Sequence, residues 1–133
     1  MTNIIVNVAA QHDVTPDQLA AGVIELPAAY KETVRKLITF DQLPTRELIL
    51  ERAAAVAETL AYWWYRENGG NSPLTVMIGG APWFMGPLER ALRNDHIVPV
   101  YAFSKRVSVE ENLPDGTVKK TFVFKHEGFI DAV

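Results

Sequence analysis

The chain has 133 residues, 48% of them hydrophobic and 22% charged, which is the balance of one globular domain spanning residues 1–133. Its formal net charge of −3 argues against binding of duplex nucleic acid, which depends on a surplus of Lys and Arg. The lack of cysteine excludes disulfides and thiolate metal sites. No apolar run is long enough for a membrane span and no basic residue before Lys31 could start a signal peptide, so we expect a cytoplasmic protein.

The first third of the chain predicts alternating strands and helices. NIIVNVA at 3–9 is apolar and β-branched, as in a buried strand. Thr15 and Pro16 form a helix start, with a glutamine three residues after the threonine to complete a capping box. VIEL at 23–26 predicts a second strand, and the apolar spacing of 28–38 predicts a helix.

The middle of the chain holds the longest expected element. Thr45 caps a helix predicted over 46–67, which the Gly/Asn/Pro segment at 68–73 ends. LTVMI at 74–78 predicts a strand, and residues 86–94 predict a short helix.

The last third predicts strands only. IVPVYAF at 97–103 reads as a strand in which Pro99 favours an edge position or a strand start. A loop is expected at 103–106. VSVEE and TVKKTFVFKHEGF then flank the turn sequence NLPDG and predict a β-hairpin.

This order predicts an α/β fold, a Rossmann-like, mostly parallel sheet with helices on both faces and a C-terminal β-hairpin. Ligands of such sheets bind beyond the carboxyl ends of the parallel strands, where the strand order reverses. The loops 9–15, 79–86 and 103–106 are therefore expected to meet at one edge of the sheet.

The segment IGGAPWFMGP leaves a strand and enters a helix. Its amides at Gly79, Gly80 and Ala81 could hold a phosphate, because glycine permits close approach and helix starts favour anions. The alternative is a tight turn that only needs glycine. Trp83 and Phe84 could stack on a base, or belong to the core or to a dimer interface.

Two further groups could contribute to this edge. Ser104, Lys105 and Arg106 offer a hydroxyl and two cations for phosphate, or else are solvated charges that open the hairpin. His12 follows the first strand and could act as a general base or phosphate donor, or be a surface histidine. The three histidines lack any metal-ligand spacing, so no metal site is expected.

Five segments in order resemble those of small CRISPR-associated accessory proteins of the Csx type, which are single-domain CARF-like proteins. The segments are QHDVTPDQ, VMIGGAPWFM, IVPVYAFSKR, EENLPDGTVKK and VFKHEGF. The long helix ending in YWWYREN has no counterpart in that pattern, and the Gly79–Pro82 loop departs from the more polar turn of those proteins.

The resemblance implies a CARF-like homodimer that binds cyclic oligoadenylate and could act as a ring nuclease without metal or other cofactor. It implies catalytic roles for His12 and Lys105. The implied ligand-binding residues are Gln11, Gly79, Gly80, Ala81, Trp83, Ser104 and Arg106. Cleavage would proceed by in-line attack of a ribose 2′-hydroxyl, with the protein supplying positioning and charge stabilisation.

Two other functions fit the same sequence. One is a non-catalytic dimeric or regulatory protein whose apolar interface is built from Trp63, Trp64, Trp83 and Phe84. The other is a metabolic enzyme that uses a mononucleotide in the same crevice.

Overall fold

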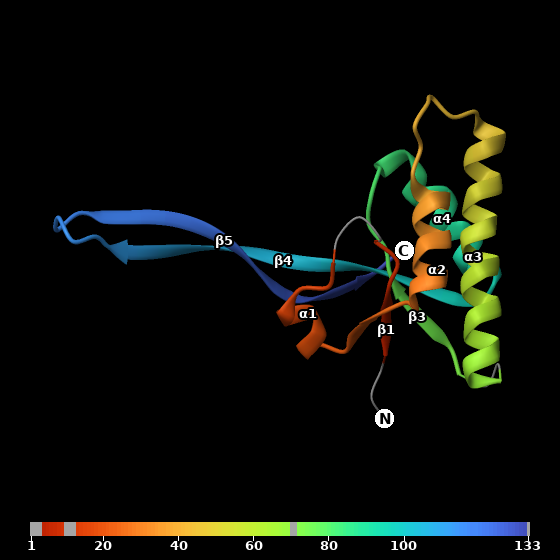
Figure 1. The fold of residues 1–133 in the computed structure, drawn as a ribbon, viewed down its shortest axis with the longest axis horizontal. Helices are drawn as coiled ribbons and strands as arrows, with labels where there is room; N and C mark the ends of the chain where they lie inside the picture. Colours follow the sequence, from red (N-terminus) through yellow and green to blue (C-terminus); the bar gives the residue numbers. More distant parts are fainter. Residues whose placement is uncertain (1–3, 10–12, 70–71, 133) are drawn as a thin grey trace.

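The computed structural model describes residues 4–9, 13–69 and 72–132. Within those residues, strands and helices alternate up to β4, and the chain ends in two long strands (Figure 1). The elements are β1 (Ile5–Asn7), α1 (Pro16–Ala20), β2 (Val23–Glu25), α2 (Ala28–Ile38), α3 (Arg46–Asn68), β3 (Leu74–Met77), α4 (Pro82–Asn94), β4 (Ile97–Asn112) and β5 (Val118–Asp131).

The sheet has the order β2-β1-β3-β4-β5. β1 pairs in parallel with β2 and β3, β3 pairs in parallel with β4, and β5 runs antiparallel to β4. The predicted fold class is confirmed as an α/β, Rossmann-like sheet with a C-terminal antiparallel hairpin. The strand order reverses at β1, since α1 leads from β1 to one neighbour while α2 and α3 lead to the other.

Local signals set most helix ends. The Thr15 side chain accepts a hydrogen bond from the Gln18 amide, and the Gln18 side chain accepts one from the Thr15 amide, as the capping box predicts. Thr45 caps α3 in the same way through the Leu48 amide. At the other end Gly69, with φ 66°, closes α3 in the left-handed conformation and donates to the carbonyl of Tyr65 at 2.7 Å.

Helix α4 begins earlier than predicted. The sequence predicted a helix over 86–94 from the spacing of Leu88, Ala91 and Leu92. The helix instead begins at Pro82, whose missing N–H costs nothing at a first helical position, and Pro87 lies inside it. Burial of Phe84 before Pro87 and of Leu88 after it outweighs the local cost.

One face of the sheet carries the main core. α2, α3 and α4 lie together on that face (Figure 1), where the sheet contributes Val6 and Val76 and the helices contribute Leu60, Phe84 and others. Val6, Val76 and Leu60 have no exposed surface. Their complete burial makes this the interface that holds the layers together.

The opposite face has a smaller apolar cluster. Val23, Met77 and Val100 are buried there, with Val14 and Phe129 packed against them. Only the short helix α1 and the segment before it cover this face among the described residues, and α1 also contacts β5. Part of the face therefore stays open beside the carboxyl ends of the strands.

The aromatic interface suggested by the sequence is not formed by the four residues that were expected. Trp63 is 5% exposed and Phe84 is 2% exposed, so both belong to the core of their own chain. Trp63 packs beside Tyr30, and Phe84 packs edge-on to Phe40. Trp64 is half-buried against the same core, which leaves only Trp83 widely exposed.

β4 and β5 extend far beyond the body (Figure 1). The loop expected at 103–106 is wrong: β4 continues through it, paired with β5 from Val100 to Asn112. The only irregularity is a shift of register between Phe103 and Ser104. We call residues 104–112, 118–126 and the turn between them the arm.

Pro99 lies in β4, as the sequence allowed at a strand start. The carbonyl of Val100 faces β3, because it accepts a hydrogen bond from the amide of Ile78 in the loop after β3. Backbone groups of successive strand residues point to opposite sides, so the Pro99 nitrogen points away from β3. Val100 and Asp131 are the last residue pair between β4 and β5. The N–H that Pro99 lacks would therefore lie at the end of the hydrogen-bond ladder between these strands.

No helix of the described residues is long and apolar enough to cross a membrane.

Alanine at two glycines should have opposite effects on the free energy of unfolding. Gly69→Ala should destabilise by about 1 kcal/mol, because alanine is strained in the left-handed cap. Gly86→Ala should stabilise by roughly 0.5–1 kcal/mol, because Gly86 is inside α4 and an added methyl meets only ordinary contacts. Urea unfolding of the two variants measures both changes, and the same sign for both would contradict this account of the caps.

Candidate functional site: a crevice at the carboxyl ends of the parallel strands

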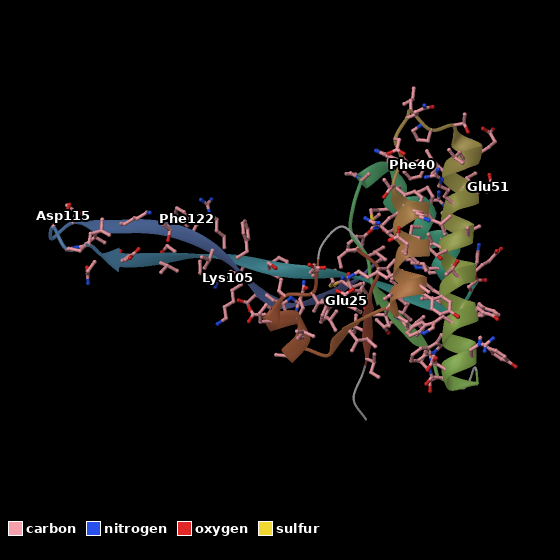
Figure 2. The ribbon with its side chains drawn as sticks, in the orientation of Figure 1. Glu25, Phe40, Glu51, Lys105, Asp115 and Phe122 are labelled. Atoms are coloured by element: carbon pink, nitrogen blue, oxygen red, sulfur yellow. The ribbon has the colours of Figure 1, made fainter. Side chains whose placement is uncertain are left out.

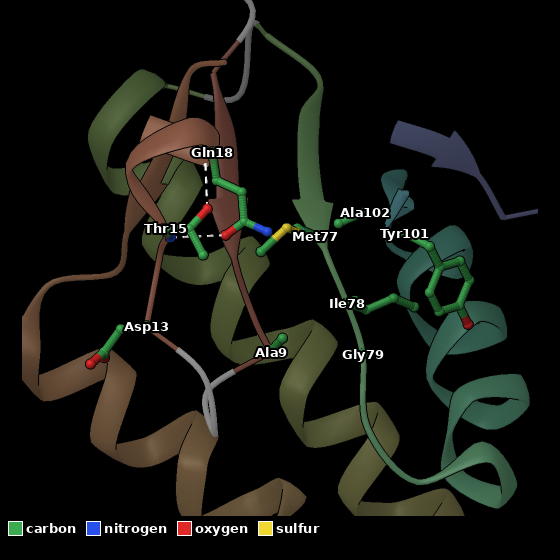
Figure 3. Close-up of a pocket in the computed structure, with 9 residues that line it drawn as sticks. All are labelled: Ala9, Asp13, Thr15, Gln18, Met77, Ile78, Gly79, Tyr101 and Ala102. Atoms are coloured by element: carbon green, nitrogen blue, oxygen red, sulfur yellow. Dashed lines mark hydrogen bonds between the residues drawn. The ribbon is translucent and has the colours of Figure 1, made fainter. Parts of the chain in front are cut away.

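A crevice opens at the carboxyl ends of β1, β3 and β4 (Figure 3). Its volume is about 590 Å³. It is lined by Ala9, Asp13, Thr15, Gln18, Met77, Ile78, Gly79, Tyr101 and Ala102. Because β1 and β3 flank the reversal of strand order, the crevice lies where ligands bind in open parallel sheets.

Small and apolar residues form its floor. Ala9 lies after β1, Met77 ends β3, and Ile78 and Gly79 follow it; both Met77 and Ile78 are buried. A β-carbon added at Gly79 would lie 3.6 Å from that of Ala9. The glycine therefore keeps the two strand ends open to a ligand that approaches the main chain.

The rim on the α1 side is polar. Thr15 Oγ1 accepts from the Gln18 amide at 3.2 Å, and Gln18 Oε1 accepts from the Thr15 amide at 3.1 Å. Figure 3 shows that the Gln18 side chain reaches over the crevice toward Met77, with its amide nitrogen at the tip. Capping thus uses the Gln18 oxygen and leaves its N–H donors directed at the crevice.

A network around Glu25 holds this rim in place. Glu25 Oε1 accepts from Asn7 Nδ2 and from the Val14 amide, both at 3.0 Å. Lys31 Nζ lies 3.2 Å from Glu25 Oε2 and 3.6 Å from Asp13 Oδ1. One carboxylate therefore joins β1, β2, α2 and the segment before α1.

The same network limits the positive charge near the crevice. The hydrogen bond and the charge of Glu25 raise the pKa of Lys31 above its usual value, with a smaller contribution from Asp13. Lys31 is thus already engaged by two carboxylates. Since no Lys or Arg is among the crevice residues that the structure describes, phosphate groups would need donors other than side-chain cations there.

Tyr101 forms the opposite wall with its ring. Figure 3 shows its hydroxyl directed away from Thr15 and Gln18, and the hydroxyl donates to Glu89 Oε2 at 2.6 Å. Arg93 lies 3.4 Å from the other oxygen of Glu89 and also donates to the Ala132 carbonyl. Burial, followed by the bond to Glu89, raises the pKa of Tyr101, so its hydroxyl stays protonated and bound to Glu89 to more alkaline pH than a free phenol.

The predicted glycine loop lies partly in the crevice. Gly79 lines it, whereas Gly80 and Ala81 border a second cavity of about 110 Å³ against Phe84 and Leu88. Within the described chain, no hydrogen bond engages the amides of these three loop residues. Trp83 borders neither cavity and packs edge-on to Phe40, which argues against stacking on a base.

Gln11 and His12, expected at this edge, lie outside the described residues. The third expected loop is replaced by strand, which changes where its residues point. Successive side chains of a strand face opposite sides, so Ser104 and Arg106 share the face of Ala102 while Lys105 lies on the other face. Lys105 and Arg106 therefore lie on opposite faces of β4, and their joint action on one phosphate stays a prediction.

Sequence reasoning missed the lining roles of Tyr101, Met77, Ala102 and Gln18. Gln18 was recognised only as a capping residue, and the other three were assigned to strands without regard to face. Side chains two residues apart in a strand share a face, so Ala102 would have been placed on the face of the buried Val100 and Tyr101 on the opposite face. Their convergence on a cavity depends on the parallel register and carries no local signal.

The described residues contain no group of three or more His, Cys, Asp or Glu that could hold a metal ion.

A family model matches the chain over residues 4–130. The chain belongs to the uncharacterized protein MJ1673 family. No curated protein and no solved structure matches it significantly.

The Glu25 network predicts a contrast between two glutamates. Glu25→Gln should lower the free energy of unfolding by about 1–2 kcal/mol, because glutamine cannot form the ion pair with Lys31. Asn7 Nδ2 and the Val14 amide would still donate to a side-chain oxygen at this position. Glu32→Gln removes an exposed ion pair with Arg35 within one helix and should change stability far less. Denaturant unfolding at pH 7 measures both, and equal losses would contradict the structural role of Glu25.

Tyr101 predicts a dependence of stability on alkaline pH. A phenol whose pKa is raised in the folded protein stabilises it below the unfolded value near 10 and loses that contribution as the pH rises further. Tyr101→Phe should therefore show a shallower fall of the melting temperature between about pH 10 and 11 than the unchanged protein. Parallel curves would show that the hydroxyl is not held as described.

Proposed function

We propose that the protein binds a nucleotide in the crevice at the carboxyl ends of β1, β3 and β4, and that this nucleotide is a cyclic oligoadenylate. The observation that supports a ligand site is the cavity of about 590 Å³ at the reversal of strand order. Its polar rim and apolar floor suit a ligand with both a flat apolar part and hydrogen-bonding groups.

Phosphate would be held by the main chain and by one residue of the arm. The amides of Gly79, Gly80 and Ala81 are free of hydrogen bonds within the described chain and stand between a strand end and the start of α4. Arg106 lies on the face of β4 that carries Ala102, four residues beyond it, or about 13 Å along the strand. Its guanidinium is 3.9 Å from the ring centre of Phe122.

The separation of these groups favours an extended ligand. A mononucleotide in the crevice would leave Arg106 about 13 Å away along β4. An oligonucleotide ring carries several phosphates, so one could meet the loop amides while another meets Arg106. The cyclic oligoadenylate, suggested by the five sequence segments, has this form.

Metal-independent cleavage is the further step implied by that resemblance. An in-line attack of a ribose 2′-hydroxyl on the adjacent phosphate needs a rigid cradle and donors to the developing charge. Arg106, whose guanidinium stacks on the Phe122 ring, is better held in place for this role than Lys105. His12 remains the candidate to orient or deprotonate the attacking hydroxyl.

The proposal predicts binding that is sensitive to one methyl group. Purified protein in EDTA buffer should bind cyclic tetra- or hexa-adenylate in calorimetric titration, with AMP as the mononucleotide control. Gly79→Ala should weaken binding about tenfold or more, since it narrows the approach to the main chain, while its contact of 3.6 Å with Ala9 is tolerable for folding. Gly86→Ala adds the same methyl inside α4, away from the crevice, and should bind normally.

A second pair of variants in the same titration tests the arm face. Arg106→Ala should weaken binding by roughly ten- to a hundredfold, and Lys105→Ala should have a much smaller effect. Chromatography of the incubated ligand detects cleavage. If neither ring binds, the nucleotide proposal fails, and if AMP alone binds, the site is that of a mononucleotide enzyme.

A further inference from the structure

The arm is a two-stranded ribbon without a neighbour. Nine cross-strand pairs join Ser104–Asn112 to Val118–His126, so the ribbon is about 30 Å long. β3 pairs with β4 only as far as Val100, so both edges of the arm are free within the described chain. Figure 2 places Lys105 near its base, Phe122 farther out and Asp115 at its tip.

The turn at the tip is well formed. Asp115 Oδ1 accepts from the Thr117 amide at 2.9 Å and from its hydroxyl at 2.6 Å. Gly116, with φ 86°, donates to the Leu113 carbonyl, and the Leu113 amide donates to Thr117. The ribbon is therefore closed in a defined register, although a two-stranded hairpin alone is only marginally stable in water.

Both faces of the arm are apolar at their centre. One face carries Phe122 and Phe124, which are 51% and 75% exposed, with Arg106 over the Phe122 ring. Val109 and Val123 are on the other face, and each is more than two-fifths exposed. Apolar side chains on both sides of a projecting ribbon indicate that it is covered in an assembly.

Charge separates the arm from the rest of the chain. Residues 104–126 hold five basic and three acidic side chains, a net charge of +2. The whole chain has −3, which leaves −5 on the remaining residues. Two arms would therefore repel each other, whereas the arm of one copy and the body of another attract.

The dimensions fit that arrangement. A domain the size of the body is roughly 35 Å across, so an arm of about 30 Å can reach over most of a second copy. A ribbon about 10 Å wide covers roughly 300 Å² with one face. Two such contacts, counted on both partners, bury about 1,200 Å², the lower limit of a specific interface.

We propose that the arm is a dimerisation element that docks on the acidic body of a second copy of this chain, with two arms exchanged about a two-fold axis. Phe124 and Phe122 supply the apolar contact, and the arm lysines supply attraction to the partner. This arrangement stands on the shape and charge of the arm and does not depend on the nucleotide proposal.

Sedimentation of the full chain tests the dimer. The unchanged protein should be a dimer that dissociates as salt is raised. Phe124→Asp should raise its dissociation constant at least about tenfold. Phe124→Leu is the matched control, because leucine keeps an apolar side chain at the same exposed position of the arm and should change the dissociation constant far less. Circular dichroism should show that both variants keep their helices.

Carbodiimide cross-linking of mixed ¹⁴N- and ¹⁵N-labelled protein tests the docking surface. Links between copies should join Lys119, Lys120 or Lys125 to carboxylates of the body. Links from those lysines to Glu110 or Glu111 of another copy would overturn docking on the body in favour of arm pairing.

A monomer at high concentration would overturn the proposal, as would a dimer unaffected by Phe124→Asp. A monomer whose arm binds a single-stranded oligonucleotide would assign the arm to nucleic acid instead.

Discussion

Burial of β1 between β2 and β3 is the constraint on which the other features depend. Val6 of this strand is fully buried against the helices, and its backbone pairs in parallel on both sides. Parallel pairing requires crossovers, so the chain must leave β1 through α1 in one direction and return through α2 and α3 to the other side. That requirement creates the reversal of strand order and leaves the crevice at its carboxyl end.

The crevice combines a rigid frame with few charges of its own. Glu25 is satisfied by Asn7, the Val14 amide and Lys31, and Tyr101 is bound to Glu89, so both groups are already engaged within the chain. Among the described residues, the Gln18 side-chain amide and the main-chain amides after β3 are the donors that remain. Such a site recognises its ligand through shape and backbone contacts, and an anionic ligand depends on more distant cations.

The arm and the body follow different physical rules. In the body, apolar residues such as Leu60 and Val76 have no contact with water, which accounts for its stability. In the arm, Phe122 and Phe124 are exposed and the backbone has a single partner strand. A two-stranded ribbon alone is only marginally stable in water, so the arm would be stabilised by the docking proposed for it.

Residue patterns alone were sufficient for the elements whose signals are local. The caps at Thr15 and Thr45, the helix over 28–38 and the parallel order of the sheet follow from side-chain hydrogen bonding, periodicity and crossover chirality. The path of residues 103–106 depends on partners 18 to 25 residues away, because pairing with β5 turned an expected loop into strand and put Lys105 and Arg106 on opposite faces. The start of α4 and the burial of Trp63 and Phe84 likewise depend on packing between the helices and the sheet. Such packing can offset an unfavourable residue such as Pro87, and it cannot be predicted from the residues of one segment.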